Sequence, residues 1–362
     1  EITTDIATGA VAVSDLEIRP DSANVIYAGV QNVQRLKQAG LDSVQFLPAG
    51  SSPGVLSTAD LDGDGNPDMI AANEGTNTLS VYLNQSQGAV FLRNDYRVGS
   101  GPSGIQAADL DGDGDLDLVS ANRVKETVSV LFNDSTGVFA LPVDFFVGGP
   151  VSSVALSDVD NDNDVDIIAA DESAGTVHVF QNDGLGSYEA PSVYKVDSGL
   201  EELVSGDFTG NGLPDIVTIS KTSGTITMLR NEGNALFAAQ PLIDAGPSPS
   251  QIVSADFDLD GNLDVAVASS DDRVRVFRND ASGSFLAAVN FAIADTATDL
   301  STGDVDHDSY FDLIIPLGNG SVTALACSHN SPQPIIAFDV GPQLAEAFGQ
   351  HRPNWSARCW ID

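Results

Sequence analysis

The sequence is short of basic residues and of long apolar runs. Lysine and arginine together number 15 against 52 aspartates and glutamates, which gives a formal net charge of −37 at pH 7. A surface this acidic repels phosphate backbones and anionic lipids, so we expect no nucleic-acid partner. No apolar run approaches the roughly 20 residues that a helix needs to cross a bilayer, so we also expect no membrane insertion.

Histidine, cysteine and methionine are also scarce, with four, two and two copies. The sequence has no G-x-S-x-G nucleophile motif, no zinc-type cluster of cysteine and histidine, and no phosphate-cradling glycine loop. The cysteines, Cys327 and Cys359, give little information about the redox compartment. His178 alternates with apolar residues in GTVHVFQN, so we expect it to pack within a strand. We therefore predict no catalytic residue and no organic cofactor.

The chain nevertheless has the composition of a folded protein. Apolar residues make up 42% of its 362 residues, which argues against general disorder despite the net charge. Glycine is abundant, with 34 copies, as expected for many short strands joined by tight turns.

The main positive feature is one acidic motif, D-x-[DT]-x-[DN]-x-x-x-D, that recurs at nearly constant spacing. Successive copies are separated by 49, 49, 49, 49 and 48 residues. Repetition with such a period indicates one supersecondary unit used several times. The six copies, each named below as a loop after its first residue, begin at Asp60, Asp109, Asp158, Asp207, Asp256 and Asp304.

Each repeat has the pattern of four short strands. In the unit that starts near residue 103, SGIQAAD alternates like a strand and leads into the acidic loop 109–117. The segments LDLVSAN, ETVSVLFND and VFALPVDFFVG then supply three more strands. Four strands in about fifty residues, without helical periodicity, are typical of a propeller blade. An open stack of repeats is the alternative.

A further unit precedes the first acidic loop. The segment VAVSDLEIRPDSANVIYAG keeps the strand pattern, but its loop has only Glu17 and Asp21 in place of the alternating aspartates. We therefore predict an all-β, seven-bladed β-propeller with four antiparallel strands per blade and calcium loops between strands 1 and 2 of six blades. The propeller is expected to span residues 1–340, with blades starting near residues 11, 54, 103, 152, 201, 250 and 298.

Ring closure is open to two solutions. Either QPIIAFDVG, after the last acidic loop, or the N-terminal EITTDIATG has the pattern of a closing strand. The tail 341–362 departs from the repeat, and we expect it to pack on the last blade. A disulfide between Cys327 and Cys359 would hold it there.

The spacing within each loop predicts a calcium site. Side-chain oxygens at positions 1, 3 and 5, the backbone carbonyl of position 7 and the carboxylate of position 9 can converge on one ion. A set of six to eight oxygen ligands selects Ca²⁺ over zinc or copper. Position 6 needs a left-handed conformation, which glycine adopts readily and asparagine tolerates. An EF-hand is excluded, because position 12 is Ala71 or Ser120 where that motif has glutamate, and the flanks are β-type.

Up to six calcium ions are expected. The Asp207 loop should bind most weakly, because Thr209 and Asn211 replace two aspartates there. The predicted ligands are Asp60, Asp62, Asp64, Asn66 and Asp68; Asp109, Asp111, Asp113, Asp115 and Asp117; Asp158, Asp160, Asp162, Asp164 and Asp166; Asp207, Thr209, Asn211, Leu213 and Asp215; Asp256, Asp258, Asp260, Asn262 and Asp264; and Asp304, Asp306, Asp308, Tyr310 and Asp312.

These loops resemble FG-GAP or VCBS-type repeats, as in the integrin α-subunit propeller. The motifs are DLDGDGNPD, DLDGDGDLD, DVDNDNDVD, DFTGNGLPD, DFDLDGNLD and DVDHDSYFD, each followed by an apolar strand. The resemblance covers about residues 11–340, although the Phe-Gly/Gly-Ala-Pro signature is kept only in part, as in VGSGPSG. It implies a seven-bladed propeller with structural Ca²⁺ in an extracellular setting. Some members are lectins, such as the fungal integrin-like lectins, others mediate adhesion, and some are appended to enzymes, so the family indicates fold better than function.

The remaining loops offer a binding face opposite the calcium loops. Their basic candidates are Arg123, Lys125, Lys221 and Arg273. The aromatics that recur after the third strand are expected to pack between blades; they are Phe91, Phe139, Tyr188, Phe237 and Phe285.

We thus predict a secreted or cell-surface binding module for a glycan or an extracellular protein. Two alternatives stay open: an enzyme acting on extracellular polysaccharide, and a structural module of a longer surface protein. The chain starts at Glu1 without a leader pattern, so we expect a removed signal peptide or an excised fragment.

Overall fold

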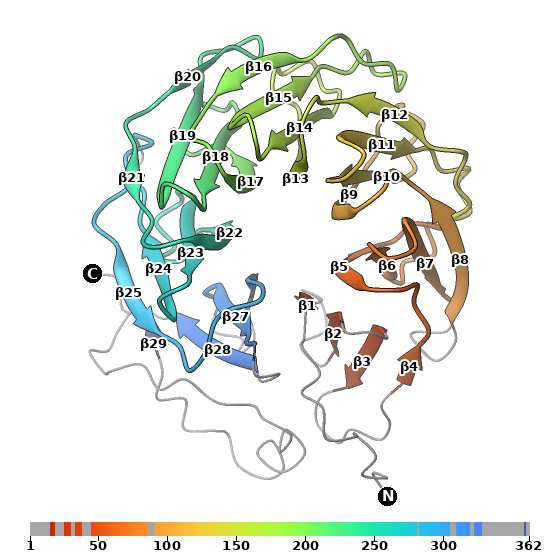
Figure 1. Ribbon diagram of the computed structural model, residues 1–362, viewed down its shortest axis with the longest axis horizontal. Helices are drawn as coiled ribbons and strands as arrows, with labels where there is room; N and C mark the ends of the chain where they lie inside the picture. The colour runs from red at the N-terminus through yellow and green to blue at the C-terminus, as the bar shows by residue number, and fades with distance from the viewer. Residues whose placement is uncertain are drawn as a thin grey trace, which may run out of the picture.

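β-Sheets stand around a central axis, and in the sheets whose first strand is labelled in Figure 1 that strand lies nearest the axis. The computed structural model describes residues 15–18, 25–29, 33–37, 45–85, 91–280, 282–304, 309–318, 322–327 and 358–359. Among the described residues, no helix is long and apolar enough to cross a membrane.

Six of the sheets have four antiparallel strands in the order of the chain. A short fifth strand, β21 (Ile243–Asp244), also pairs with β19. From the axis outward, the strands of the six sheets are β1 (Asp15–Ile18), β2 (Val25–Gly29), β3 (Val33–Lys37) and β4 (Gln45–Leu47); β5 (Pro53–Ala59), β6 (Asp68–Asn73), β7 (Thr78–Asn84) and β8 (Phe91–Arg97); β9 (Pro102–Ala108), β10 (Asp117–Asn122), β11 (Thr127–Leu131) and β12 (Val143–Phe146); β13 (Val151–Ser157), β14 (Asp166–Asp171), β15 (Thr176–Phe180) and β16 (Ser192–Lys195); β17 (Leu200–Gly206), β18 (Asp215–Ser220), β19 (Thr225–Asn231) and β20 (Phe237–Ala239); and β22 (Pro249–Ala255), β23 (Asp264–Ser269), β24 (Arg273–Phe277) and β25 (Val289–Ala292).

The prediction of seven blades with four antiparallel strands each is wrong, because the described strands form six such blades. The remaining sheet has three antiparallel strands, β26 (Ser301–Gly303), β27 (Asp312–Pro316) and β28 (Val322–Cys327). Its outer place is taken by the two-residue β29 (Arg358–Cys359), which pairs with β28 in parallel. A hairpin after β28 would give an antiparallel neighbour, whereas a strand that returns from the C-terminal end of the chain can enter in the same direction.

The mixed sheet and the first antiparallel blade are neighbours in the ring, because β1 contacts both β26 and β27. The register of β28 and β29 sets Cys327 opposite Cys359. The disulfide expected between them stays a prediction. The two segments expected to supply a closing strand, 333–341 and 1–9, lie outside the described residues.

The hydrophobic core lies between adjacent blades. From β6 to β24, strands 2 and 3 of each blade are mostly buried, as in β10, whose six residues are all buried. One core cluster joins Leu110 and Val119 of one blade to Ile167 and Phe180 of the next. Each such side chain contributes roughly 1.5–3 kcal/mol when it leaves water. Outer strands such as β8 and β16 have only half-buried and exposed residues, so most of the apolar burial that stabilises the ring lies between the blades.

The recurring aromatics belong to these interfaces, which confirms the expectation for four of them. The Phe139 ring meets Tyr96 of the preceding blade edge-on, with centroids 5.3 Å apart. Tyr194 meets Phe237 in the same way at 5.2 Å. The other ring pairs are Phe145–Tyr188 and Phe208–Phe285. The expected packing role of His178 is also confirmed: it is buried on β15 and bonds Thr176 Oγ1 through Nε2 at 3.1 Å.

Candidate metal centres and a candidate ligand groove

Each acidic loop is folded around its first aspartate. In the Asp60 loop, one carboxylate oxygen accepts the amide of Asp64 at 3.1 Å and the other accepts the amide of Gly65 at 2.9 Å. The residue at position 6 has positive φ in all six loops, as predicted, including Asn163 (75°) and Ser309 (76°). The other four are Gly65, Gly114, Gly212 and Gly261.

The ninth residue is a buried aspartate at the start of the second strand. One carboxylate oxygen of Asp68 accepts a hydrogen bond from the backbone N–H of Leu61 at 2.8 Å, and the other accepts one from the backbone N–H of Asn84 at 2.7 Å. Burial raises the pKa of Asp68 to about 6 and that of Asp264 to about 7. These hydrogen bonds leave lone pairs on both oxygens, so position 9 can still bind a cation.

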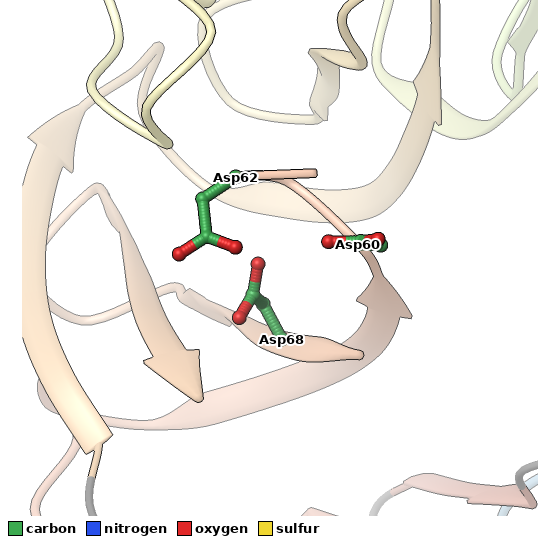
Figure 2. Close-up of side chains that lie close together, drawn as sticks. All are labelled: Asp60, Asp62 and Asp68. Atoms are coloured by element: carbon green, nitrogen blue, oxygen red, sulfur yellow. The ribbon is translucent and has the colours of Figure 1, made fainter. Parts of the chain in front are cut away.

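Carboxylate oxygens converge in four of the described loops. In the Asp60, Asp109 and Asp158 loops, oxygens of positions 1, 3 and 9 lie within 4.8 Å of one another. Figure 2 shows this arrangement in the first of them, where the carboxylates of Asp62 and Asp68 face each other beside Asp60. In the Asp256 loop the converging oxygens belong to positions 1, 3 and 5.

The other predicted ligands are placed differently. At position 5, the carboxylate of Asp64 accepts a hydrogen bond from the backbone N–H of Asn66 at 2.7 Å, which closes a local turn. Thr209 and Asn211 leave the Asp207 loop with two carboxylates. Asp306 and Asp308 lie outside the described residues. The use of the position 7 carbonyls stays a prediction.

The donor set fits a hard divalent cation. Burial and the neighbouring carboxylate of Asp64 raise the pKa of Asp62, as expected for negative charges held together without compensation. One oxygen of Asp111 and one of Asp160 are buried without a hydrogen-bond partner among the described residues. A cation bound by these oxygens would satisfy them and neutralise the repulsion, and oxygen-only sets of this kind favour calcium.

Sequence reasoning missed a row of asparagines beside the acidic loops, and four of them tie a loop to the neighbouring blade. The Asn133 amide donates to the Leu61 carbonyl of the preceding blade at 2.8 Å and to the Leu116 carbonyl of its own loop at 3.0 Å. Its backbone N–H donates to Asp117 at 2.8 Å. The available signal was the asparagine that recurs after the third strand, followed by aspartate or glutamate in four repeats and by Gln85 in the first. We call these residues the latch asparagines: Asn84, Asn133, Asn182, Asn231 and Asn279.

The mixed sheet departs from this pattern. Cys327 stands at the latch position and gives its backbone N–H to Asp312 at 3.0 Å. A thiol has no amide group to bridge two carbonyls, so this sheet keeps the aspartate contact but not the asparagine bridge.

An open groove of about 510 Å³ lies on the other face, between the blade of β17–β21 and the blade of β22–β25. Arg275 forms one wall; its guanidinium binds both oxygens of Asp271 at 3.0 and 2.6 Å. A Cβ atom on Gly246 would lie 2.3 Å from that guanidinium, so a larger residue would have to displace the Arg275 side chain; the φ of 86° at this position also favours glycine. The lining residues are Lys221, Thr222, Ser223, Gly224, Asp244, Gly246, Pro247, Ser248 and Arg275.

The basic residues predicted for this face are all ion-paired. Lys221 Nζ lies 3.0 Å from Glu201, and Arg273 lies 3.7 Å from Asp271. Arg123 pairs with Glu172, and Lys125 with Asp144. Of these four candidates, Lys221 alone lines the groove.

The acidic loop, the buried aspartate and the following strands are the parts that a family comparison recognises. The FG-GAP-like repeat model matches residues 60–120, 109–169, 158–218, 207–267 and 256–315. The chain belongs to the FG-GAP-like repeat family. The matched residues of this FG-GAP-like propeller contain all six acidic loops, and β1–β4 lie outside them. A search of curated proteins gave no match.

Solved structures share the fold of this FG-GAP-like chain at low sequence identity. An Agrocybe aegerita lectin that recognises non-reducing terminal N-acetylglucosamine is 19% identical, with TM-score 0.53 and coverage of 83% of this chain and 87% of the lectin. BBS1N, solved in complex with ARL6DN, is 14% identical, with TM-score 0.56 and coverage of 79% and 84%. Virginiamycin B lyase from Staphylococcus aureus is 8% identical, with TM-score 0.62 and coverage of 88% and 96%. These three neighbours differ in function, so the likeness shows the fold alone.

Proposed function

We propose that the protein is a calcium-stabilised binding module that works outside the cell and recognises a glycan in the groove lined by Lys221, Asp244 and Arg275. The observation that carries the proposal is the character of this groove. Its volume lies within the range of small-ligand sites, but its lining is polar. Hydroxyl groups of Thr222, Ser223 and Ser248 stand beside charged groups, which suits a ligand rich in hydroxyl groups.

The charges of the groove favour a neutral sugar over an acidic one. Lys221 and Arg275 each have an acidic partner, and Asp244 adds a further negative charge. The chain as a whole carries a formal charge of −37, so an anionic polysaccharide would be repelled at long range. The lectin neighbour, which binds N-acetylglucosamine, supports a neutral saccharide as the ligand.

Calcium would contribute rigidity in this proposal. An ion held by positions 1, 3 and 9 would join the acidic loop to the start of the second strand. The latch asparagine joins the same loop to the next blade, as Asn133 does with Leu61. Binding of the ion to the folded state would therefore stabilise the blade interfaces on which the groove depends.

The test is an array of neutral and acidic oligosaccharides, followed by calorimetry on the best ligand with Lys221→Ala and Asp244→Asn. Both variants should weaken binding roughly five- to thirtyfold, because Lys221→Ala removes a polar partner and Asp244→Asn removes a charged one, and such losses typically cost about 1–2 kcal/mol. Lys125→Ala is the matched control, since Lys125 is also an exposed, ion-paired lysine on this face but lies on another blade. Equal affinity in all three variants would contradict the placement of the site. Release of reducing or unsaturated ends from a polysaccharide would contradict a binding role without catalysis.

A further inference from the structure

The third position of the acidic loops has a different environment from blade to blade. In the Asp109 and Asp158 loops, one oxygen of Asp111 and one of Asp160 are buried without a hydrogen-bond partner among the described residues. In the Asp256 loop, Asp258 receives the guanidinium of Arg278, with Nη1 3.6 Å from Oδ2. A cation supplied by the chain itself thus stands beside one candidate metal centre.

Arg278 reaches this place from the end of the third strand. It directly precedes the latch residue Asn279, whose backbone N–H binds Asp264 of the same loop at 2.8 Å. The backbone of this strand is therefore fixed against the loop. The side chains of Arg278 and Asp258 are only 24% and 13% exposed, so water screens their attraction less than at an open surface.

We propose that Arg278 is a tethered counter-cation that weakens divalent-cation binding at the Asp256 loop and makes this site fill after the Asp60, Asp109 and Asp158 sites. The inference rests on the proposed calcium binding by the acidic loops. A divalent ion that enters the Asp256 loop meets a positive charge on one of its ligands. It must either displace the guanidinium from Asp258 or share that carboxylate with it, and both options cost affinity.

The residues at the equivalent place in other blades show that a positive charge is not required there. Before the latch asparagine of the Asp158 loop stands Gln181, whose uncharged amide donates a hydrogen bond from Nε2 to Asp160 Oδ2 at 2.5 Å. Phe132 stands at this place beside the Asp109 loop. Glutamine is thus an accepted replacement in this fold and makes the natural test variant, Arg278→Gln.

Arg230 provides a matched control on the neighbouring blade. It precedes the latch residue Asn231, but position 3 of its loop is Thr209, which carries no charge, and its ion-pair partner is Glu232 at 3.6 Å. Arg230→Gln removes the same charge from the same place without touching a third-position carboxylate. Arg278→Lys keeps the charge at the Asp256 loop.

The experiment is a calcium titration of the chelator-treated 362-residue protein. Flow dialysis reads the ions bound per chain against free calcium, and circular dichroism checks folding. In Arg278→Gln, we expect one of the weaker binding steps to tighten roughly three- to tenfold, the range that loss of a partly screened charge supports. Arg278→Lys and Arg230→Gln should bind like the unmodified protein. In an Asp258→Asn background, Arg278→Gln should have little further effect, because the pair is already broken.

The possible results distinguish a failure of the role of Arg278 from a failure of calcium binding by the acidic loops. An unchanged or weaker step in folded Arg278→Gln would overturn the role of Arg278 while leaving calcium binding intact. An equal gain in Arg230→Gln would also overturn it, by showing that only net charge matters. An unmodified chain that binds no calcium would overturn both proposals.

Discussion

The side chain of Asn133 on one blade reaches the backbone carbonyl of Leu61 on the preceding blade, at 2.8 Å. The same residue fixes Asp117 through its backbone N–H at 2.8 Å. One residue thus connects the third strand, its own acidic loop and the neighbouring loop. The candidate metal centres and the blade interfaces are parts of one network, and a change in either should be felt by the other.

Removal of a latch side chain should therefore destabilise the ring. Asn133→Ala leaves the carbonyls of Leu61 and Leu116 without their amide donor in buried surroundings. We expect a loss of about 1–3 kcal/mol in the free energy of unfolding, measured by urea titration. Asn290→Ala is the control, because Asn290 is exposed and donates only a 3.3 Å bond to Ala288. A latch variant as stable as this control would contradict the network.

The Asp207 loop should be convertible into a stronger site. Thr209→Asp with Asn211→Asp restores the carboxylates that the other loops have at positions 3 and 5. Thr209 Oγ1 is buried without a hydrogen-bond partner among the described residues. A carboxylate at this position would therefore place its oxygens where the present side-chain oxygen has no partner. We expect a higher midpoint of thermal unfolding in calcium and a lower one in chelator, since unneutralised carboxylates repel.

The control for this conversion is the single substitution Thr209→Asn, with Asn211 left unchanged. It alters the shape of position 3 without adding charge. A newly occupied site contributes about 2.7 kcal/mol at a free calcium concentration of 100 Kd. Identical midpoints for the acidic and neutral variants in calcium would show that this loop cannot hold an ion.

Glu202 should make stability depend on pH. Its Oε2 accepts the Ile252 amide of the next blade at 2.6 Å. Loss of water around the carboxylate, with smaller contributions from Asp299 and Glu201, raises the pKa of Glu202 to about 8. The folded protein therefore binds this proton more tightly than the unfolded chain, whose value lies near 4.5. Stability from this group is fully present below about pH 4.5 and is lost as the pH rises towards about 8.

Glu202→Gln should flatten this dependence, because the amide cannot ionise. The measurement is the free energy of unfolding in urea between pH 5 and pH 8, with the difference between native protein and variant taken at each pH. Glu201→Gln serves as the control; Glu201 makes only the smallest contribution to the raised pKa of Glu202, so the pH profile of this variant should stay close to that of the native protein. A Glu202→Gln profile parallel to the native one would contradict the assignment.

The sequence was sufficient for the repeat, the strand order within a blade and the left-handed turns, because these depend on local spacing. Ser309 shows how far this holds: its φ of 76° follows from its place in the motif although serine rarely adopts it. Long-range pairing was not accessible in this way. The two residues of β29 carry no periodic pattern, so their parallel pairing with β28, and with it the count of six antiparallel blades, could not be foreseen.

The same distinction applies to the site. Aspartates that converge within one loop were visible from their spacing, as in the Asp60 loop. The ion pair of Arg278 with Asp258 depends on how the third strand lies against the loop, which spacing alone does not fix. The latch bonds, such as that from Asn182 to Leu110, join residues 72 positions apart and needed the blade packing itself.

The central claim is that the acidic loops are calcium sites that stabilise the ring. It is tested most directly by thermal unfolding in calcium, in excess chelator, and after calcium is restored. Because an ion that binds only the folded state raises its stability by RT ln(1 + [L]/Kd), several occupied loops predict a large, reversible drop of the midpoint on chelation. An unchanged midpoint would contradict the account, since the converging carboxylates would then contribute nothing through a bound ion.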